Sequence, residues 1–271
     1  MDASEILLEP SALDAVMARG AILIDARKPG EFRKGHIPGA MPLSTYELLV
    51  TNSSLDGMKT FADAAAGRFS SVGVNNERQV VIYDEGTGMR AARELWILEY
   101  IGHRNARMLH GGLLQWQAAG GPVLIDTDIA TVRPKKIQLS IASGCNAPAD
   151  EIVRRAGSWN MTLIDVRNDL EWAGKDKTNC CPRRGRIPHA IHIEWTKFLD
   201  NGRYKSPEAI MALLEKHDIN PRNELVVYCH RGSRSASTYF ALKYAGLPGA
   251  RNYIGSWHEW SSRQDLPIEQ G

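Results

Sequence analysis

Short apolar runs that end in a charged or polar residue alternate with helical patterns along the chain. "AILIDAR" (21–27) and "QVVIYD" (79–84) are rich in β-branched residues, which is typical of buried strands. "MTLIDVR" (161–167) and "ELVVYC" (224–229) have the same character. Strands that alternate with helices predict an α/β fold, in which a parallel sheet is covered by helices on both faces.

The segments that follow these strands have helical spacing. In "SPEAIMALLEKHDI" (206–219), Ser206 is a capping residue, Pro207 suits the first helical turn, and Ile210, Leu213 and Leu214 share one face. "MRAARELWILEYIGH" (89–103) and "SRSASTYFALKYAGL" (233–247) are also predicted helices.

The chain contains an internal repeat. "AILIDARKPGEF" (21–32) returns as "MTLIDVRNDLEW" (161–172), "GHIPGA" (35–40) as "GRIPHA" (185–190), "VVIYDEGTGMRAA" (80–92) as "LVVYCHRGSRSAS" (225–237), and "LHGGLLQW" (109–116) as "YIGSWHEW" (253–260). Four blocks in the same order predict two similar domains. We place them at 1–124 and 137–271, joined by a linker at 125–136 within a Gly- and Pro-containing stretch.

Composition narrows the classes of protein that fit. The 271 residues are 43% hydrophobic, as in packed globular proteins. A net charge of +2 argues against a dedicated nucleic-acid binder, and no apolar run approaches a membrane span. Four cysteines do not make a disulfide scaffold, and the acidic N-terminus does not resemble an export signal. We therefore expect a cytoplasmic protein with reduced thiols.

The stretch "VVYCHRGSRSAS" (226–237) places a thiol where a parallel sheet binds ligands. Cys229 ends a strand, and the loop after it contains Gly232, which allows unusual backbone angles. Ser233 or Ser235 is expected to cap the next helix. Such a loop turns backbone N–H groups toward one point, and Arg231 and Arg234 add positive charge. Both effects favour a thiolate at Cys229. The alternative interpretation is a buried cysteine beside solvated arginines.

With these motifs, the chain resembles the tandem-domain rhodaneses, a family of sulfurtransferases. The resemblance rests on the Asp-x-Arg strand ends, the "GHIPGA" and "GG…W" blocks, and the cysteine followed by a basic loop, and it covers nearly the whole chain. It implies two tandem rhodanese-like domains. It also implies an active-site loop of Cys229, His230, Arg231, Gly232, Ser233 and Arg234, with Ser235 opening the helix.

The resemblance implies a reaction in two steps. The Cys229 thiolate takes a sulfane sulfur from a small anionic donor, and the resulting persulfide passes that sulfur to cyanide or to a thiol acceptor, including a protein thiol. The N–H groups of residues 230–235 are expected to hold the persulfide, and the two arginines to attract the donor, with Arg234 pointing inward. Neither a metal nor an organic cofactor is implied. Asp84 stands where the second domain has Cys229, so the first domain is expected to be catalytically silent.

Other residues of the shared motifs receive supporting roles. Asp165 and Arg167 are expected to form a structural salt bridge between loops. His36 fits either packing or a place at the domain interface, and Trp257 and Trp260 fit core or cleft-wall positions.

The sequence departs from the family at several positions. Glu171 and Trp172 stand where some relatives have an arginine that binds the donor. In "GRIPHA", Arg186 and His189 replace the His and Gly of the common block. The basic insertion 174–186 carries Arg183, Arg184 and Arg186, which either supply positive charge to the donor site or form a solvated loop. We assign Arg186 to substrate binding. The adjacent Cys180 and Cys181 make a weak metal pair because no second Cys/His pair accompanies them, and Cys145 is expected to be structural.

Three functions stay open at this point. Because the loop is basic, thiosulfate is favoured over 3-mercaptopyruvate as the donor of a sulfurtransferase. A phosphatase or arsenate reductase of the same fold is the second possibility, although Cys229 and Arg234 have four intervening residues where the phosphatases have five. The third is a non-catalytic module that carries sulfur for a partner.

Overall fold

The computed structural model describes residues 6–86, 88–125, 132–177 and 181–270. The chain divides into two compact units. The first comprises Met1–Leu48, Phe61–Ala142 and Asn201–Tyr204, and the second comprises Leu49–Thr60, Ser143–Asp200 and Lys205–Gly271. Residues 126–131 of the expected linker lie outside the described residues.

The first unit is built on a five-stranded sheet in which every pairing is parallel, in the order β1-β5-β4-β2-β3. Its strands are β1 (Leu7–Leu8), β2 (Ile22–Asp25), β3 (Ala40–Pro42), β4 (Val80–Tyr83) and β5 (Ala106–Leu109). The helical segments are η1 (Pro10–Ala12), α2 (Leu13–Ala18), α3 (Pro29–Phe32), α4 (Leu55–Ser71), α5 (Met89–Tyr100) and α6 (Gly112–Ala118).

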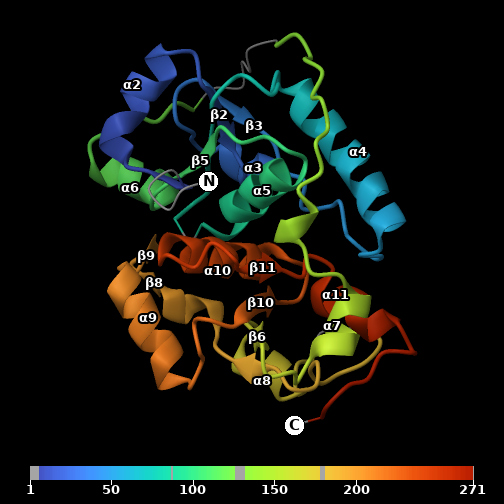
Figure 1. Ribbon diagram of the computed structural model, residues 1–271. Coiled ribbons are helices and arrows are strands. Elements are labelled where there is room, and N and C mark those ends of the chain that lie inside the picture. Colours follow the sequence, from blue (N-terminus) through green and yellow to red (C-terminus); the bar gives the residue numbers. More distant parts are fainter. Residues whose placement is uncertain (1–5, 87, 126–131, 178–180, 271) are drawn as a thin grey trace. The chain divides into compact units, whose positions relative to one another are not determined.

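Helices cover both faces of this sheet. Leu13 of α2 and Trp116 of α6 join Leu23 and Val81 of the strands in one buried cluster. Helices α4 and α5 lie on the other side of the strands (Figure 1). All four residues of β2 and of β4 are buried, which explains why these segments read as continuous apolar runs.

The second unit repeats this plan with four parallel strands in the order β11-β10-β6-β7. They are β6 (Met161–Asp165), β7 (Ile191–His192), β10 (Glu224–Tyr228) and β11 (Arg251–Asn252). Two further short strands, β8 (Leu199–Asp200) and β9 (Arg203–Tyr204), follow β7 in sequence. The helical segments are η2 (Ser143–Cys145), α7 (Ala149–Arg155), α8 (Asp169–Trp172), η3 (Trp195–Phe198), α9 (Pro207–Lys216), α10 (Ser233–Tyr244) and α11 (Ser256–Ser262).

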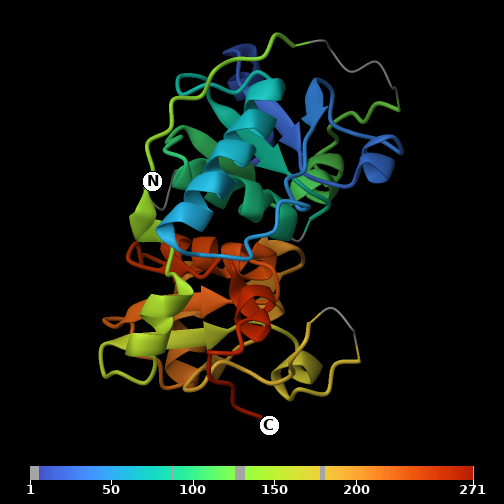
Figure 2. The ribbon, with the colours of Figure 1, turned by 90° about the vertical axis from the view of Figure 1, so that its right-hand side faces the viewer.

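The second sheet is also covered on both faces. Ile152 of α7 and Trp260 of α11 pack with Leu163 and Val226 of the strands. Figure 2 shows β6 and β10 side by side with α11 over them, and α9 and α10 lie on the opposite side in Figure 1. The predicted fold class, two α/β domains with helix-covered parallel sheets, is confirmed. No helix among the described residues is long and apolar enough to cross a membrane.

The N-termini of two helices can be compared with the capping residues that the sequence predicts. Helix α9 begins as predicted: the Ser206 hydroxyl accepts a hydrogen bond from the Ala209 N–H at 3.2 Å, and Pro207 occupies the first turn. Helix α10 begins at Ser233, so the expected start at Ser235 was wrong. The expected serine cap was also wrong, because Gly232 occupies the N-cap position with φ of 83° and no side chain caps the helix. Only glycine adopts this left-handed conformation without strain, and the helix therefore starts directly after it.

Candidate active site

The Cys229 sulfur lies in a ring of hydrogen-bond donors at the carboxyl end of β10. The Gly232 N–H donates to Sγ at 3.1 Å, and the N–H groups of Arg231 and Ser235 interact with the same sulfur and lower its pKa. The Ser235 hydroxyl lies 3.4 Å from the same atom. We call the N–H groups of residues 231, 232 and 235 the sulfur cradle. Cys229 is only 1% exposed, but the amides face its sulfur as the sequence predicts.

The cradle changes the acidity of the thiol. Burial by itself raises the pKa of Cys229, but the positive charge of Arg234 and the hydrogen bonds from Ser235 and Arg231 outweigh it, so the pKa lies below its ordinary value. Donors that point at a sulfur atom stabilise its negative charge, since they need no reorganisation when the charge appears.

The start of helix α11 holds the cysteine and the following loop. The Cys229 N–H donates to the Ser256 hydroxyl at 3.1 Å, and the Trp257 N–H donates to the Cys229 carbonyl at 3.0 Å. Ser256 is fully buried and has φ of 54°, an unusual conformation for a residue other than glycine. The repeat contained a signal that we missed, because Ser256 replaces Gly112 of the first copy, whose φ is 58°.

Arg234 is paired with a carboxylate. Its two terminal nitrogens donate to the two oxygens of Glu171 at 2.6 and 2.7 Å. Burial would raise the pKa of Glu171, but the hydrogen bonds and charge of Arg234 hold it below its ordinary value. Glu171 is itself positioned by a capping box with Asn168 at the start of α8. The sequence predicts that Arg234 points inward but does not indicate its partner, and the structure pairs it with Glu171.

Asp165 and Arg167 form the expected ion pair at the end of β6. Arg167 Nη2 donates to Asp165 Oδ2 at 2.6 Å and to the Gly185 carbonyl at 2.8 Å, which ties the strand end to the next loop. The guanidinium also lies 4.6 Å from the ring centre of Trp257. The first unit repeats this arrangement with Arg27, Asp25 and Gly35.

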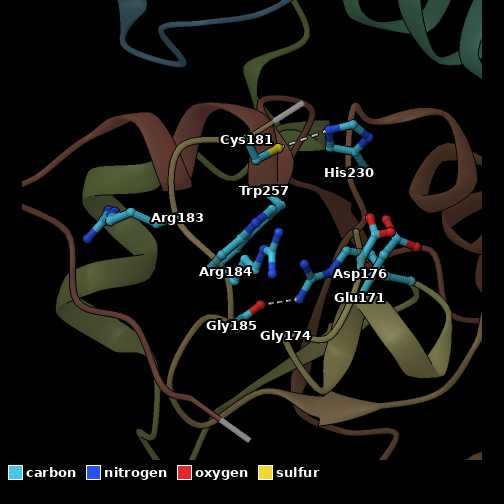
Figure 3. Close-up of a pocket in the computed structure, with 10 residues that line it drawn as sticks. Glu171, Gly174, Asp176, Cys181, Arg183, Arg184, Gly185, His230 and Trp257 are labelled. Atoms are coloured by element: carbon cyan, nitrogen blue, oxygen red, sulfur yellow. Dashed lines mark hydrogen bonds between the residues drawn. The ribbon is translucent and has the colours of Figure 1, made fainter. Parts of the chain in front are cut away.

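The arginines of the basic insertion behave differently from one another. Arg186 pairs with Glu269 and lies 4.3 Å from the centre of the Trp172 ring, and its contribution to substrate binding stays a prediction. Arg186 thus contacts a carboxylate and an aromatic ring, and it is not among the residues that line the pocket described next. Arg183 donates to backbone carbonyls at the end of α11, including that of Trp260 at 2.8 Å, and points away from the other labelled side chains in Figure 3.

A pocket opens beside the cysteine loop within the second unit (Figure 3). Cys181 and His230 face each other at its rim, with 3.1 Å between Sγ and Nε2. Burial and the charge of Arg231 lower the pKa of His230 to about 4. His230 is therefore neutral near pH 7. The pocket is lined by Arg167, Glu171, Gly174, Asp176, Cys181, Arg183, Arg184, Gly185, His230 and Trp257.

In the first unit, a carboxylate takes the place of the sulfur. Asp84 follows β4 and accepts hydrogen bonds from the N–H groups of Gly88, Arg90 and Ala91 at 3.0, 2.7 and 3.1 Å. Its loop is one residue longer, since the N-cap glycine is four residues after Asp84 but three after Cys229. The N–H groups of this loop are thus occupied by the protein's own anion.

The remaining predicted residues lie within the packed units. His36 stacks on Phe32 with 3.8 Å between ring centres, which favours its packing role. Trp260 is fully buried, and Cys145 is buried near the start of the second unit. Cys180 lies outside the described residues.

Comparisons with known proteins agree with this geometry. Residues 9–119 and 148–263 each match the rhodanese-like domain family. A thiosulfate sulfurtransferase of Azotobacter vinelandii is 30% identical over 266 residues, which cover 97% of each chain. A 3-mercaptopyruvate sulfurtransferase of Escherichia coli is 27% identical over 91% of each chain. The crystal structure of an anaerobic ergothioneine biosynthesis enzyme from Chlorobium limicola shares the fold, with a TM-score of 0.86 at 22% identity over 98% of this chain and 70% of that one.

Proposed function

The chain belongs to the rhodanese family, and we propose that it is a sulfurtransferase that moves a sulfane sulfur from thiosulfate to cyanide or a thiol through a persulfide on Cys229. The observation that carries the proposal is the sulfur cradle. Three backbone N–H groups converge on one sulfur atom, so they are placed to hold the charge of the thiolate and of a second sulfur bound to it. The sulfurtransferase relatives supply the reaction class.

The reaction balances in two displacements. The Cys229 thiolate attacks the outer sulfur of thiosulfate, the S–S bond of the donor breaks, and its electron pair leaves with sulfite. The cysteine then carries –S–S⁻. Cyanide attacks the terminal sulfur, the new S–S bond breaks, and thiocyanate leaves while the thiolate of Cys229 returns. No proton, oxidant or reductant is needed in either step.

Charge around the loop supports thiosulfate as the donor. Arg234 carries positive charge close to Cys229, although Glu171 neutralises much of it. The Arg231 Nε atom is buried without a hydrogen-bond partner among the described residues, and this arginine supplies further positive charge for a doubly negative donor. The 3-mercaptopyruvate donor of the Escherichia coli relative is the alternative within the same reaction class.

Intact-mass measurement combined with turnover tests the proposal. Treatment with thiosulfate is expected to add the mass of one sulfur atom to the wild-type chain and to a Cys145→Ser control, and nothing to Cys229→Ser. Thiocyanate production from thiosulfate and cyanide should disappear in Cys229→Ser alone. Donor kinetics with 3-mercaptopyruvate, measured under matched conditions, compare the two donors.

Three outcomes would contradict the proposal. Sulfur uptake that persists in Cys229→Ser would place the persulfide elsewhere. Hydrolysis of a phosphate ester without thiocyanate formation would favour the phosphatase class. Persulfide formation without turnover by any small acceptor would favour a sulfur carrier.

A further inference from the structure

We propose that Cys181, His230 and His258 form a binding site for a zinc-class divalent cation at the rim of the pocket. One ligand atom from each side chain lies within 4.8 Å of the other two. The three residues come from the basic insertion, the cysteine loop and helix α11, so the fold brings together donors that are distant in sequence. The two displacements described above use none of these three side chains as a nucleophile or leaving group.

The two histidines are held in place by the backbone. The His258 N–H donates to the His230 carbonyl at 2.9 Å, which fixes the start of α11 against the cysteine loop. Their rings meet edge to face, with 6.1 Å between centres and an interplanar angle of 72°. Cys181 completes the group through its 3.1 Å contact with His230 Nε2 (Figure 3). Two of the three ligands are therefore positioned before any ion arrives.

The donor set selects the class of cation. A thiolate and imidazole nitrogens are the ligands of zinc and similar ions, whereas magnesium and calcium need oxygen. Zinc binds sulfur at about 2.3 Å and nitrogen at about 2.0–2.1 Å, so tetrahedral ligands lie roughly 3.3–3.6 Å apart. The present separations, 3.1 Å for one pair and at most 4.8 Å for the others, require only small side-chain adjustments.

An unsatisfied atom also indicates a missing partner. His258 Nδ1 is buried and accepts or donates no hydrogen bond among the described residues. A buried polar atom without a partner costs free energy, and coordination of an ion through this nitrogen would remove that cost. The charge of Arg231 near both rings opposes a cation, whereas the negative charge of Glu171 near His230 favours one, and Cys181 would bind the ion as a thiolate. Three protein ligands leave a fourth coordination position for water or another ligand.

Cobalt(II) is the probe, because it substitutes for zinc and reports its ligands by absorption. The protein is first stripped of metal with a chelator under reducing conditions, and Cys229→Ser is used as the background so that the reactive thiol is not a ligand. We expect saturation at one cobalt per chain, with a thiolate-to-cobalt charge-transfer band and the strong visible bands of tetrahedral coordination. Zinc should displace the cobalt and remove both signals.

Ligand variants decide the assignment. In the same background, Cys181→Ser should abolish the charge-transfer band, and His258→Asn should raise the cobalt Kd about tenfold or more. Cys145→Ser, which removes a cysteine far from the cluster in sequence, should bind cobalt like its parent. A charge-transfer band that persists in Cys181→Ser, or a Kd unchanged in His258→Asn, would overturn the proposal. Circular dichroism verifies that each variant is folded, and because Cys229 is absent the result is independent of sulfur transfer.

Discussion

At the scale of single residues, the site contains a largely buried positive charge beside Cys229. Arg234 carries this charge, and the carboxylate of Glu171 pairs with it. Arg234 is 17% exposed and Glu171 12%, so neither group is fully hydrated. A two-pronged hydrogen bond between such groups is stronger than a surface ion pair. Removal of one partner leaves the other charge partly buried and unpaired, which is costly.

This pair makes a prediction about acid stability. Because Arg234 depresses the pKa of Glu171 in the folded protein, the pair stabilises the fold above the unfolded-state pKa of about 4.5 and loses this effect as the pH falls through the lower folded-state value. Glu171→Gln should therefore lower the thermal unfolding midpoint at pH 7 by roughly 2–8 °C, for a loss of about 1–2 kcal/mol. The difference from wild type should shrink markedly near pH 3.

A surface pair serves as the control. Glu31 and Lys34 are also hydrogen-bonded, at 3.1 Å, but both are well exposed. Glu31→Gln should leave the unfolding midpoint nearly unchanged at both pH values, because exposed ion pairs contribute little. An equal effect of the two substitutions, measured by calorimetry, would show that burial of the Arg234 pair is unimportant.

At the scale of elements, the site depends on one strand–loop–helix unit, β10 to α10. Gly232 is the position in this unit that requires glycine. Its φ is 83°, and a Cβ atom would lie 2.5 Å from Ile254 Cδ1 and 2.6 Å from the Ile254 carbonyl oxygen. The backbone oxygen cannot move without shifting the segment before α11. A side chain at this position would therefore displace the N–H group that donates to Cys229.

We expect Gly232→Ala to slow persulfide formation by at least about tenfold, because one donor of the cradle is misplaced. The cost in stability should be about 1–3 kcal/mol. Gly246→Ala is the matched control, since Gly246 has φ of 88° with open space around its Cβ position. The Gly246→Ala variant should lose stability through backbone strain, but its rate of persulfide formation should equal that of the wild type. Stopped-flow kinetics with thiosulfate and thermal unfolding distinguish the two effects, and equal rates for both variants would contradict the role given to Gly232.

At the scale of the whole molecule, the chain contains the same sheet plan twice, but the central strand is followed by a cysteine in one unit only. The strand orders β5-β4-β2-β3 and β11-β10-β6-β7 correspond element by element. In each unit, the arginine of the Asp-x-Arg strand end donates a hydrogen bond to the carbonyl of the equivalent loop glycine, Gly35 or Gly185. The units differ at the end of the central strand, where Asp84 replaces Cys229. The Asp84 carboxyl group accepts hydrogen bonds from three N–H groups of its loop, and the function proposed above assigns the chemistry to the second unit.

Asp84→Ala tests this division. The substitution removes the acceptor of three backbone N–H groups, so the folded protein should lose about 1–3 kcal/mol of stability. Thiocyanate production per folded molecule at 25 °C should stay within about twofold of wild type. Calorimetry and the turnover assay on the same sample measure both quantities, and a loss of turnover without a loss of stability would contradict a purely structural role.

The amino-acid sequence by itself determined the repeated α/β plan, the buried strands, the Asp-x-Arg ties and the loop that surrounds Cys229. These features rest on short-range patterns, in which apolar runs, strand ends and glycine positions are read within a few residues. Only the tertiary structure decided the partners of the charged groups and brought together the groups that we propose to bind a metal ion. Arg234 meets Glu171 across 63 residues, Arg186 meets Glu269 across 83, and Cys181 meets His230 across 49. Folding brings such groups together through packing, and no local pattern specifies which carboxylate or imidazole a distant side chain will contact.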